Sequence, residues 1–169
     1  VRLVDAFGGM KDLNYHLIRC VGDPKERFEE DALRILRAVR FSAQLDFAIE
    51  EHTADAIRSQ VLSLKNISAE RIQAELIKLL MSDHPERLKD AYELGITRVI
   101  LPEWDRMVGV EQHTPHHMYD VAEHTLHAIM NVKQDKILRL TMLFHDMGKP
   151  FAKTTDENGQ DHFKEHSIG

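Results

Sequence analysis

Apolar side chains recur at every third or fourth position from residue 27 onward, and this spacing limits the possible folds more than any other feature. Such a period places apolar side chains on one face of an α-helix. It predicts a loop at 100–104 and helices at 27–44, 49–64, 68–82, 85–94, 117–132 and 136–147. Strand-like alternation is confined to the first 22 residues, where Gly8-Gly9 marks a turn. The sequence therefore predicts an all-α, elongated fold with at most a short N-terminal strand or turn.

The expected helices also identify the expected core. A chain of 169 residues with 43% hydrophobic side chains is long enough to bury one. The positions predicted to be mostly buried are Leu33, Leu36, Val39, Phe41, Leu76, Leu79 and Leu80. Gly95 is expected to end the helix at 85–94, because glycine favours the position just after a helix.

Charge and composition exclude several classes of protein. The formal net charge is −6, so overall charge gives no support for nucleic-acid binding, and any RNA-binding surface must be a local patch. The single cysteine, Cys20, excludes an intrachain disulfide and fits a reducing cytoplasm. No apolar run approaches the roughly 18 to 20 residues of a membrane span, so no membrane partner is predicted. Oligomeric state is not readable from these features.

The segment EEDALRILRAVRF, residues 29–41, carries arginines at every third position, Arg34, Arg37 and Arg40, with Asp31 three residues ahead. One interpretation is a surface ion pair between Asp31 and Arg34, worth only tenths of a kcal/mol. The other is recognition of a base, because a carboxylate accepts from an amino group while a guanidinium donates to a ring nitrogen or carbonyl. Such a pair would accept cytosine and adenine and reject guanine and uracil. Spacing alone leaves both interpretations open.

Histidines gather in the last third of the chain, where eight of the 11 lie at or beyond position 113. Within this region His145 and Asp146 are adjacent at the end of an apolar helix, and Asp120 lies four residues before His124. Imidazole and carboxylate ligands together suit a divalent transition metal, or a mixed site that tolerates magnesium or manganese. A lone histidine on an apolar face is more often a core residue, so the dipeptide by itself is weak support.

The arrangement of a histidine, His-Asp about twenty residues later, Gly-Lys, and a further histidine resembles the HD superfamily of metal-dependent phosphohydrolases, over residues 113–169. The resemblance implies that His124, His145 and Asp146 bind a divalent metal such as Ni²⁺, Mn²⁺ or Mg²⁺. It also implies that Lys149 and His166 take part in phosphohydrolysis. The family's last ligand is an aspartate expected beyond Gly169, so the site is expected to be formed but weakly occupied. The alternative is an HD unit retained as a scaffold for RNA.

Three motifs in family order resemble the tRNA nucleotidyltransferases, the CCA-adding enzymes of the bacterial poly(A) polymerase family. VDAFGGMKDLNYHLIRCV is similar to the hinge motif, EEDALRILRAVRF to the E-D-x-x-R motif, and ISAERIQAELIKLL to the helix that supports it. The resemblance implies that Asp31 and Arg34 read the base and that Glu30 supports them. Arg37 and Arg40 would hold the nucleotide or order the helix.

The same resemblance implies three regions: residues 1–22 as the trailing edge of the nucleotidyltransferase head and hinge, 23–112 as a helical neck that binds RNA and nucleotide, and 113–169 as the first part of an HD domain. The catalytic head, with its Mg²⁺-binding carboxylates, is expected before Val1, and no Asp-x-Asp occurs in this chain. The implied partners are tRNA, CTP and ATP. Alternatives are a bacterial poly(A) polymerase, a stand-alone HD nucleotide phosphohydrolase and a non-catalytic RNA-binding adaptor.

Overall fold

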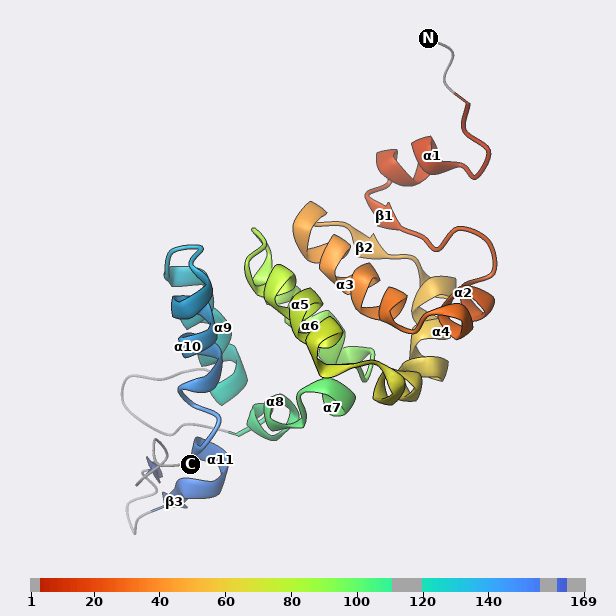
Figure 1. Ribbon diagram of the computed structural model, residues 1–169. Helices are drawn as coiled ribbons and strands as arrows, with labels where there is room; N and C mark the ends of the chain where they lie inside the picture. Colours follow the sequence, from red (N-terminus) through yellow and green to blue (C-terminus); the bar gives the residue numbers. More distant parts are fainter. Residues whose placement is uncertain (1–3, 111–119, 156–160, 164–169) are drawn as a thin grey trace. The chain divides into compact units, whose positions relative to one another are not determined.

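The computed structural model describes residues 4–110, 120–155 and 161–163. The chain divides into two compact units, Val1–Ile100 and Leu101–Gly169. Helices make up most of each unit (Figure 1), which confirms the all-α prediction. Among the described residues, no helix combines the length and apolar character that crossing a lipid bilayer would require.

The core of the first unit lies between α3 (Leu33–Leu45) and α5 (Ala69–Leu80), which run side by side (Figure 1). The burial predictions are confirmed for Leu33, Leu36, Val39, Leu79 and Leu80, whereas Leu76 is only half-buried. The prediction for Phe41 is wrong, because its side chain is 42% exposed. Two residues after Val39, Phe41 is rotated by about 200° and so faces away from the core.

The helix predicted at 27–44 is two helices. α2 (Pro24–Glu30) begins with proline at its first position, and the Asp23 side chain caps it by accepting from the backbone N–H groups of Lys25 and Glu26. Asp31 then adopts an extended backbone, φ −154° and ψ 103°, before α3 begins at Leu33. Asp31 and Arg34 are therefore not successive positions on one helical ridge.

The other boundaries in the first unit follow the predictions more closely. The helix predicted at 49–64 is α4 (Glu51–Gln60), continued by the tighter 3₁₀ helix η1 (Val61–Asn66). The helix predicted at 85–94 begins as a 3₁₀ turn, η2 (Pro85–Arg87), and becomes α6 (Leu88–Glu93), after which comes α7 (Thr97–Ile100). Gly95 follows α6 with φ +78°, as predicted for the residue after a helix.

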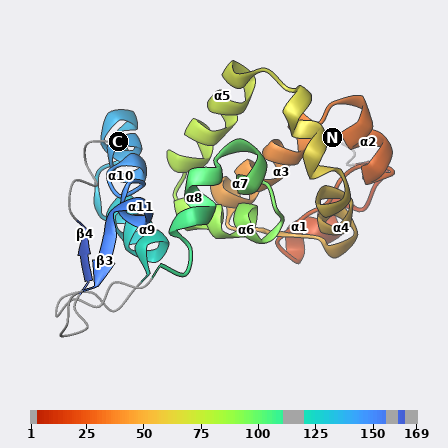
Figure 2. The same ribbon diagram turned by 90° about the horizontal axis from the view of Figure 1, so that it is seen from below.

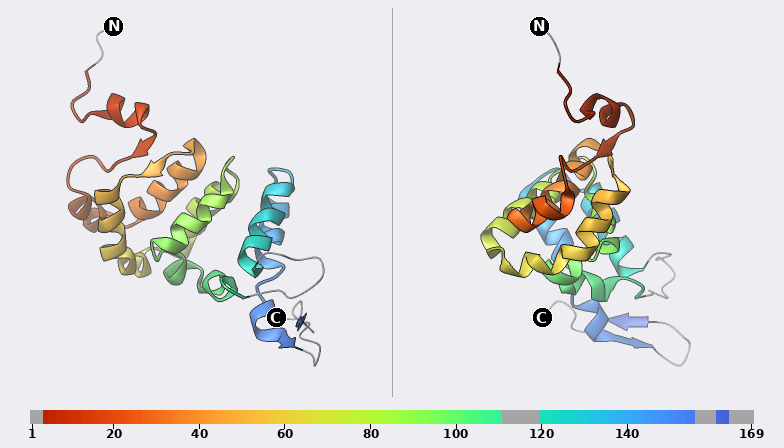
Figure 3. Two further views of the ribbon diagram at one scale, coloured as in Figure 1. Left: turned by 180° about the vertical axis from the view of Figure 1, so that it is seen from behind. Right: turned by 90° about the vertical axis from the view of Figure 1, so that its right-hand side faces the viewer.

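The N-terminal segment contains a short helix that periodicity did not predict, α1 (Gly9–Asn14), followed by the two-residue strand β1 (Leu17–Ile18). β1 pairs in parallel with β2 (Ala48–Ile49), which places Leu17 opposite Ala48 (Figure 3). This pairing fixes residues 17–18 against the segment that joins α3 to α4.

In the second unit, α9 (Val121–Asn131) and α10 (Lys136–Phe144) lie side by side (Figure 3). The loop predicted at 100–104 is wrong in part, because Pro102 opens α8 (Pro102–Met107), which buries Trp104 and Met107. α11 (Lys149–Ala152) leads into β3 (Lys153–Thr155), which pairs antiparallel with β4 (Asp161–Phe163; Figure 2). The sequence predicted strand structure only within the first 22 residues, so β2, β3 and β4 were not predicted.

Candidate functional site

The Asp31 carboxylate is held by two donors at the junction of α2 and α3. Oδ1 accepts from the backbone N–H of Leu33 at 3.1 Å, and Oδ2 accepts from Nη2 of Arg71 on α5 at 2.8 Å. Partial burial acts to raise the pKa of Asp31, but the hydrogen bonds from Arg71 and Leu33 outweigh it and leave the pKa below its ordinary value. At neutral pH the side chain is therefore an ionised acceptor.

Arg34, the other predicted base reader, has different partners. Its Nη1 donates to the backbone carbonyl of Arg27 at 3.0 Å and to Oε2 of Glu30 at 2.6 Å. Glu30 is itself paired with Arg27 at 2.9 Å, so Glu30 joins two guanidinium groups. Among the described ion pairs there is none between Asp31 and Arg34, so the surface pair considered from the sequence does not form.

Arg37 and Arg40 both point toward one buried carboxylate, that of Glu75 on α5. Arg40 donates through Nε to Glu75 Oε2 and through Nη1 to Gln44 at 2.9 Å, while the Nε of Arg37 lies 3.7 Å from Glu75 Oε1. These contacts tie α3 to α5. They correspond to the helix-ordering role considered for the two arginines, and contact with a nucleotide stays a prediction.

A hollow of about 590 Å³ opens at the α2–α3 junction. Its wall is mostly polar and consists of Phe28, Glu29, Glu30, Asp31, Ala32, Ser63, Asn66, Ile67 and Arg71. The size is within the range of small-ligand pockets. Sequence reasoning did not assign Arg71 a role. Its available signal was a cation at the third position of α5, where a helix N-terminus favours an acid.

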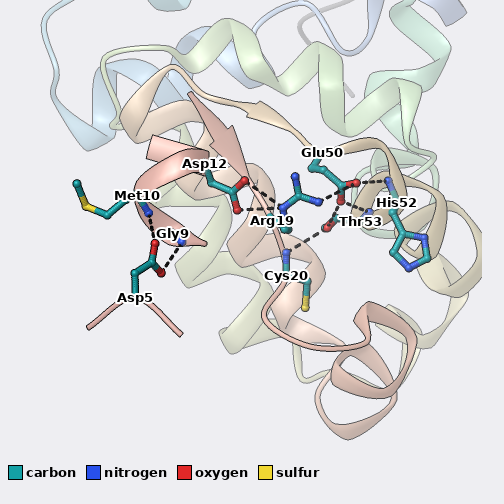
Figure 4. A network of polar contacts seen from close by, with 9 residues as sticks. All are labelled: Asp5, Gly9, Met10, Asp12, Arg19, Cys20, Glu50, His52 and Thr53. Carbon is teal, nitrogen blue, oxygen red and sulfur yellow. Dashed lines mark hydrogen bonds and ion pairs between the residues drawn. The ribbon is translucent and has the colours of Figure 1, made fainter. Parts of the chain in front are cut away.

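The predicted hinge residues make two groups of polar contacts, one around Asp5 and one around Arg19 (Figure 4). Asp5 accepts from the backbone N–H groups of Gly9 and Met10 at the start of α1, at 2.8 and 2.9 Å. The Nε of Arg19 donates to both carboxylate oxygens of Asp12, at 3.1 and 3.0 Å, and its Nη1 lies 3.2 Å from Oε1 of Glu50. Arg19 therefore connects the N-terminal segment with the start of α4.

Glu50, which Arg19 contacts, is the cap of α4. Its carboxylate accepts from the backbone N–H groups of His52 and Thr53 at 3.0 and 2.9 Å, and from the Thr53 hydroxyl (Figure 4). The backbone N–H of Cys20 in turn donates to the Thr53 hydroxyl at 3.1 Å. Burial opposes ionisation of Glu50, but these hydrogen bonds and Arg19 bring its pKa below the ordinary value.

In the second unit the structure brings together the three predicted metal ligands. One ligating atom from each of His124, His145 and Asp146 lies within 4.8 Å of the others. Nε2 of His145 is 3.1 Å and Nε2 of His124 is 3.7 Å from Oδ2 of Asp146. Ligands that bind one ion at about 2.0–2.2 Å in a tetrahedral arrangement are separated by about 3.3–3.6 Å, and the two distances to Asp146 lie close to this range on either side.

Hydrogen bonding orients the His145 ring. Nδ1 lies 2.6 Å from the backbone carbonyl of Met142, which makes Nδ1 the protonated nitrogen and leaves Nε2 to face Asp146. This use of a carbonyl to fix the ring is common behind metal-binding histidines. The hydrogen bond with Asp146 raises the pKa of His145 against the effect of burial. Asp146 is 2% exposed, yet the hydrogen bonds from His145 and Lys149 outweigh burial and lower its pKa to about 2.

The remaining residues predicted for this site are placed differently. Nζ of Lys149 lies 2.7 Å from Oδ2 of Asp146, so Lys149 forms an ion pair with this carboxylate. Asp120, which lies four residues before His124, caps α9 by accepting from the backbone N–H groups of Glu123 at 2.7 Å and Gly109 at 2.8 Å. Both its oxygens are thereby used on backbone groups. His166 lies outside the described residues.

A known family matches the middle part of the chain. Residues 46–108, from β2 to α8, match the family described as "Probable RNA and SrmB- binding site of polymerase A". The individual relatives are CCA-adding enzymes. The chain is 52% identical to the CCA-adding enzyme of Lactobacillus helveticus over 83 residues. These residues make up 49% of this chain and 21% of the relative. It is 43% identical to the CCA-adding enzyme of Levilactobacillus brevis over 113 residues. These residues make up 66% of this chain and 28% of the relative.

Solved structures agree with these relatives. The Bacillus stearothermophilus CCA-adding enzyme in complex with CTP matches 88% of this chain at 29% identity, with a TM-score of 0.67, and 36% of its own length is covered. A tRNA-processing enzyme in complex with CTP matches 89% of this chain at 26% identity, with a TM-score of 0.59. The chain is thus homologous to a part of the CCA-adding enzymes and spans about a fifth to a third of their length.

Proposed function

We propose that the full-length protein adds C and A nucleotides to the 3′ end of tRNA in the cytoplasm, with CTP and ATP as substrates. The observation that carries this proposal is the pair of separately anchored side chains at the α2–α3 junction, Asp31 and Arg34, in a chain homologous to CCA-adding enzymes. A relative of the same fold, the Bacillus stearothermophilus enzyme, was solved with CTP.

The chemistry of the pair supports selection of cytosine and adenine. Both bases carry an amino group beside an unprotonated ring nitrogen. The ionised Asp31 would accept from the amino group, and Arg34 would donate to the ring nitrogen. Uracil and guanine present a carbonyl oxygen where the carboxylate needs a donor. Glu30 holds the guanidinium of Arg34, and Glu75 holds Arg37 and Arg40, so the groups around the base are fixed before it arrives.

The proposed division of labour has three regions. Residues 1–22 form the hinge from the nucleotidyltransferase head, 23–112 form the neck that binds tRNA and nucleotide, and 113–169 belong to an HD domain. The head would supply two carboxylates that bind Mg²⁺ for activation of the primer hydroxyl. Within this chain the contribution is base selection and tRNA binding.

The test uses the full-length protein, a tRNA that lacks its terminal CCA, and each of the four nucleoside triphosphates separately. Asp31→Ala should reduce discrimination between CTP or ATP and the other two nucleotides. The matched control is Asp55→Ala, which removes an exposed carboxylate that also pairs with an arginine. Intact selectivity in Asp31→Ala, with reduced activity, would refute the base-reading role. Long runs of A without C would instead identify a poly(A) polymerase.

The second unit supports a second candidate function, metal-dependent phosphoester hydrolysis. The convergence of His124, His145 and Asp146 carries it, because two imidazole nitrogens and a carboxylate oxygen at this spacing suit Ni²⁺, Mn²⁺ or Mg²⁺. A metal bound there would lower the pKa of a bound water and supply hydroxide at neutral pH. Lys149 would supply positive charge beside the phosphate, and His166 is proposed to contact it as well.

This second function predicts hydrolysis of a 2′,3′-cyclic phosphate by the full-length protein with nickel, manganese or magnesium. His145→Ala should abolish hydrolysis and metal binding measured by calorimetry, while nucleotide addition stays nearly unchanged. His127→Ala is the matched control, since His127 is on the same helix as His124 but outside the three-residue cluster. Equal hydrolysis by wild type and His145→Ala would leave the HD unit as a scaffold for RNA.

A further inference from the structure

Arg71 approaches the proposed base reader from an element distant in sequence. It lies 40 residues after Asp31, at the start of α5, and its Nη2 is 2.8 Å from Asp31 Oδ2. The other oxygen of Asp31 accepts from the backbone N–H of Leu33 at the start of α3. Two donors thus hold the carboxylate, one on each oxygen, and each oxygen keeps a second lone pair for a ligand.

We propose that Arg71 is a positioning residue that determines base specificity through Asp31, by keeping its carboxylate a hydrogen-bond acceptor and never a donor. This inference rests on the proposed nucleotide addition and goes beyond it. Arg71 lines the same hollow as Asp31 but acts on the carboxylate, not on the base.

The reason lies in what a protonated carboxyl group would recognise. A neutral carboxylic acid has one O–H donor, which pairs with the carbonyl oxygen that uracil and guanine present. A base reader that becomes protonated in part of the molecules would therefore accept the wrong nucleotides in proportion to that fraction. The charge-assisted hydrogen bond from Arg71 favours the ionised form and so opposes this error.

The other charged groups around Asp31 do not replace Arg71. From α2, Glu29 and Glu30 line the same hollow, and their negative charges favour protonation of a neighbouring carboxylate. From α3, Arg37 acts on Asp31 only through its more distant charge, and it is paired with Glu75. The 3₁₀ helix η1 contributes the uncharged Ser63 and Asn66. Arg71 on α5 is the cation in direct contact.

The test measures nucleotide selection as a function of pH in the full-length protein. The ratio of kcat/KM for UTP to that for CTP is determined between pH 5.5 and 8.5 for wild type, Arg71→Gln and Arg71→Lys. In Arg71→Gln the ratio should rise about tenfold for each pH unit of acidification, because the protonated fraction of Asp31 rises by that factor. In the wild type, the ratio of kcat/KM for UTP to that for CTP should stay constant over more of this pH range. Arg71→Lys should restore this constant ratio.

Two controls separate this inference from the function on which it rests. Asp31→Asn carries a permanent donor, so it should admit UTP equally at every pH. If it retains full selectivity, the base-reading function itself fails. Arg58→Gln removes an arginine of similar exposure, 46% against 48%, that pairs with Glu51 and Asp55 away from the hollow, and it should keep the wild-type profile.

Two results would overturn the role of Arg71 while leaving base reading intact. If Arg71→Gln matches the wild-type ratio at every pH, Arg71 does not control Asp31. If it raises KM for all four nucleotides equally at every pH, Arg71 contacts the triphosphate directly. Thermal unfolding of each variant establishes that the protein is folded at the pH of each measurement. If Arg71→Gln does not fold, two other variants replace it. The inference then stands only if Arg71→Lys shows the wild-type pH dependence of the UTP-to-CTP ratio and that ratio rises with acidification in Arg71→Met.

Discussion

Glu75 offers the strongest test of what holds the arginine ridge, Arg34, Arg37 and Arg40 on α3, in place. Its carboxylate is 5% exposed on α5 and receives Arg40 and Arg37 from α3, with Lys78 at 3.8 Å from its own helix. Replacement by glutamine keeps the shape of the side chain and removes its charge. The arginines would then lose their shared negative charge and one of the two acceptor oxygens. Arg40, whose side chain is only 13% exposed, would be left partly buried without a carboxylate partner.

The size of the effect follows from this burial. Removing one partner of a fully buried ion pair costs about 3–5 kcal/mol, because the other charge stays buried and unpaired. Arg40 keeps its hydrogen bond to Gln44, its guanidinium stays stacked on the Phe41 ring at 4.0 Å, and water reaches part of it. We therefore expect Glu75→Gln to cost about 2–3 kcal/mol. The double replacement Glu75→Leu with Arg40→Met should recover most of that loss, because no buried charge then remains unpaired.

Amide hydrogen exchange measures the loss of stability from Glu75→Gln separately in each helix. A loss of about 2–3 kcal/mol should accelerate amide exchange in α3 and α5 by about 30- to 150-fold. Amides of α9 and α10, in the second compact unit, provide an internal reference that should not change. The matched control is Asp55→Asn, whose side chain is 65% exposed and whose pair with Arg58 should be worth less than about 0.5 kcal/mol. If Glu75→Gln exchanges no faster than this control, the ridge does not depend on the buried carboxylate.

NMR titration of His145 in the presence of EDTA should give a pKa above its ordinary 6.5, because the hydrogen bond to Asp146 favours the imidazolium, and Asp146→Asn should lower it. The stabilisation from this pair is complete below pH 6.5 and is lost as pH rises through the raised pKa, so a stability gain above that pH would contradict it. Gly95→Ala and Gly22→Ala should each cost about 1–2 kcal/mol in urea unfolding, since both glycines have φ +78°. The cost at Gly95 should be only slightly larger, because the clashing atom, Nη2 of Arg98 at 2.7 Å, ends a flexible side chain. Asp23→Ala should cost about 1 kcal/mol and Asp23→Ser much less, because serine can still cap α2.

The features that sequence predicted well are those set by nearby residues. α5 and α10 lie within their predicted ranges because their apolar positions recur regularly over several turns. The convergence of His124 and His145 was expected from spacing and resemblance, and the structure brings their ring nitrogens together with Asp146. Its metal-binding role stays a prediction.

The features that sequence missed depend on contacts between distant residues. EEDAL is a good helix-forming sequence, yet the helix stops at Asp31, whose carboxylate accepts from Leu33 and from Arg71 40 residues away. β1 requires a partner strand 31 residues later, and nothing local in the segment around Ala48 predicts it. The role of Arg71 was missed for the same reason, because periodicity describes one helix at a time and cannot show which side chains of two helices meet.

The pattern of ion pairs also bears on whether the arginine ridge recognises a phosphate or a base. Arg34 is paired with Glu30, and Arg37 and Arg40 share Glu75, so each of these guanidinium groups is already held by a carboxylate of the protein. Attraction of a phosphate backbone depends on positive charge that is free to replace counterions. The guanidinium groups of this ridge are already engaged by Glu30 and Glu75, so a phosphate would have to compete with these carboxylates. Donors and acceptors held in fixed positions are instead what recognition of a planar base edge requires, since geometry and not net attraction separates one base from another. These ion pairs therefore agree better with the proposed role in base selection than with attraction of a phosphate backbone.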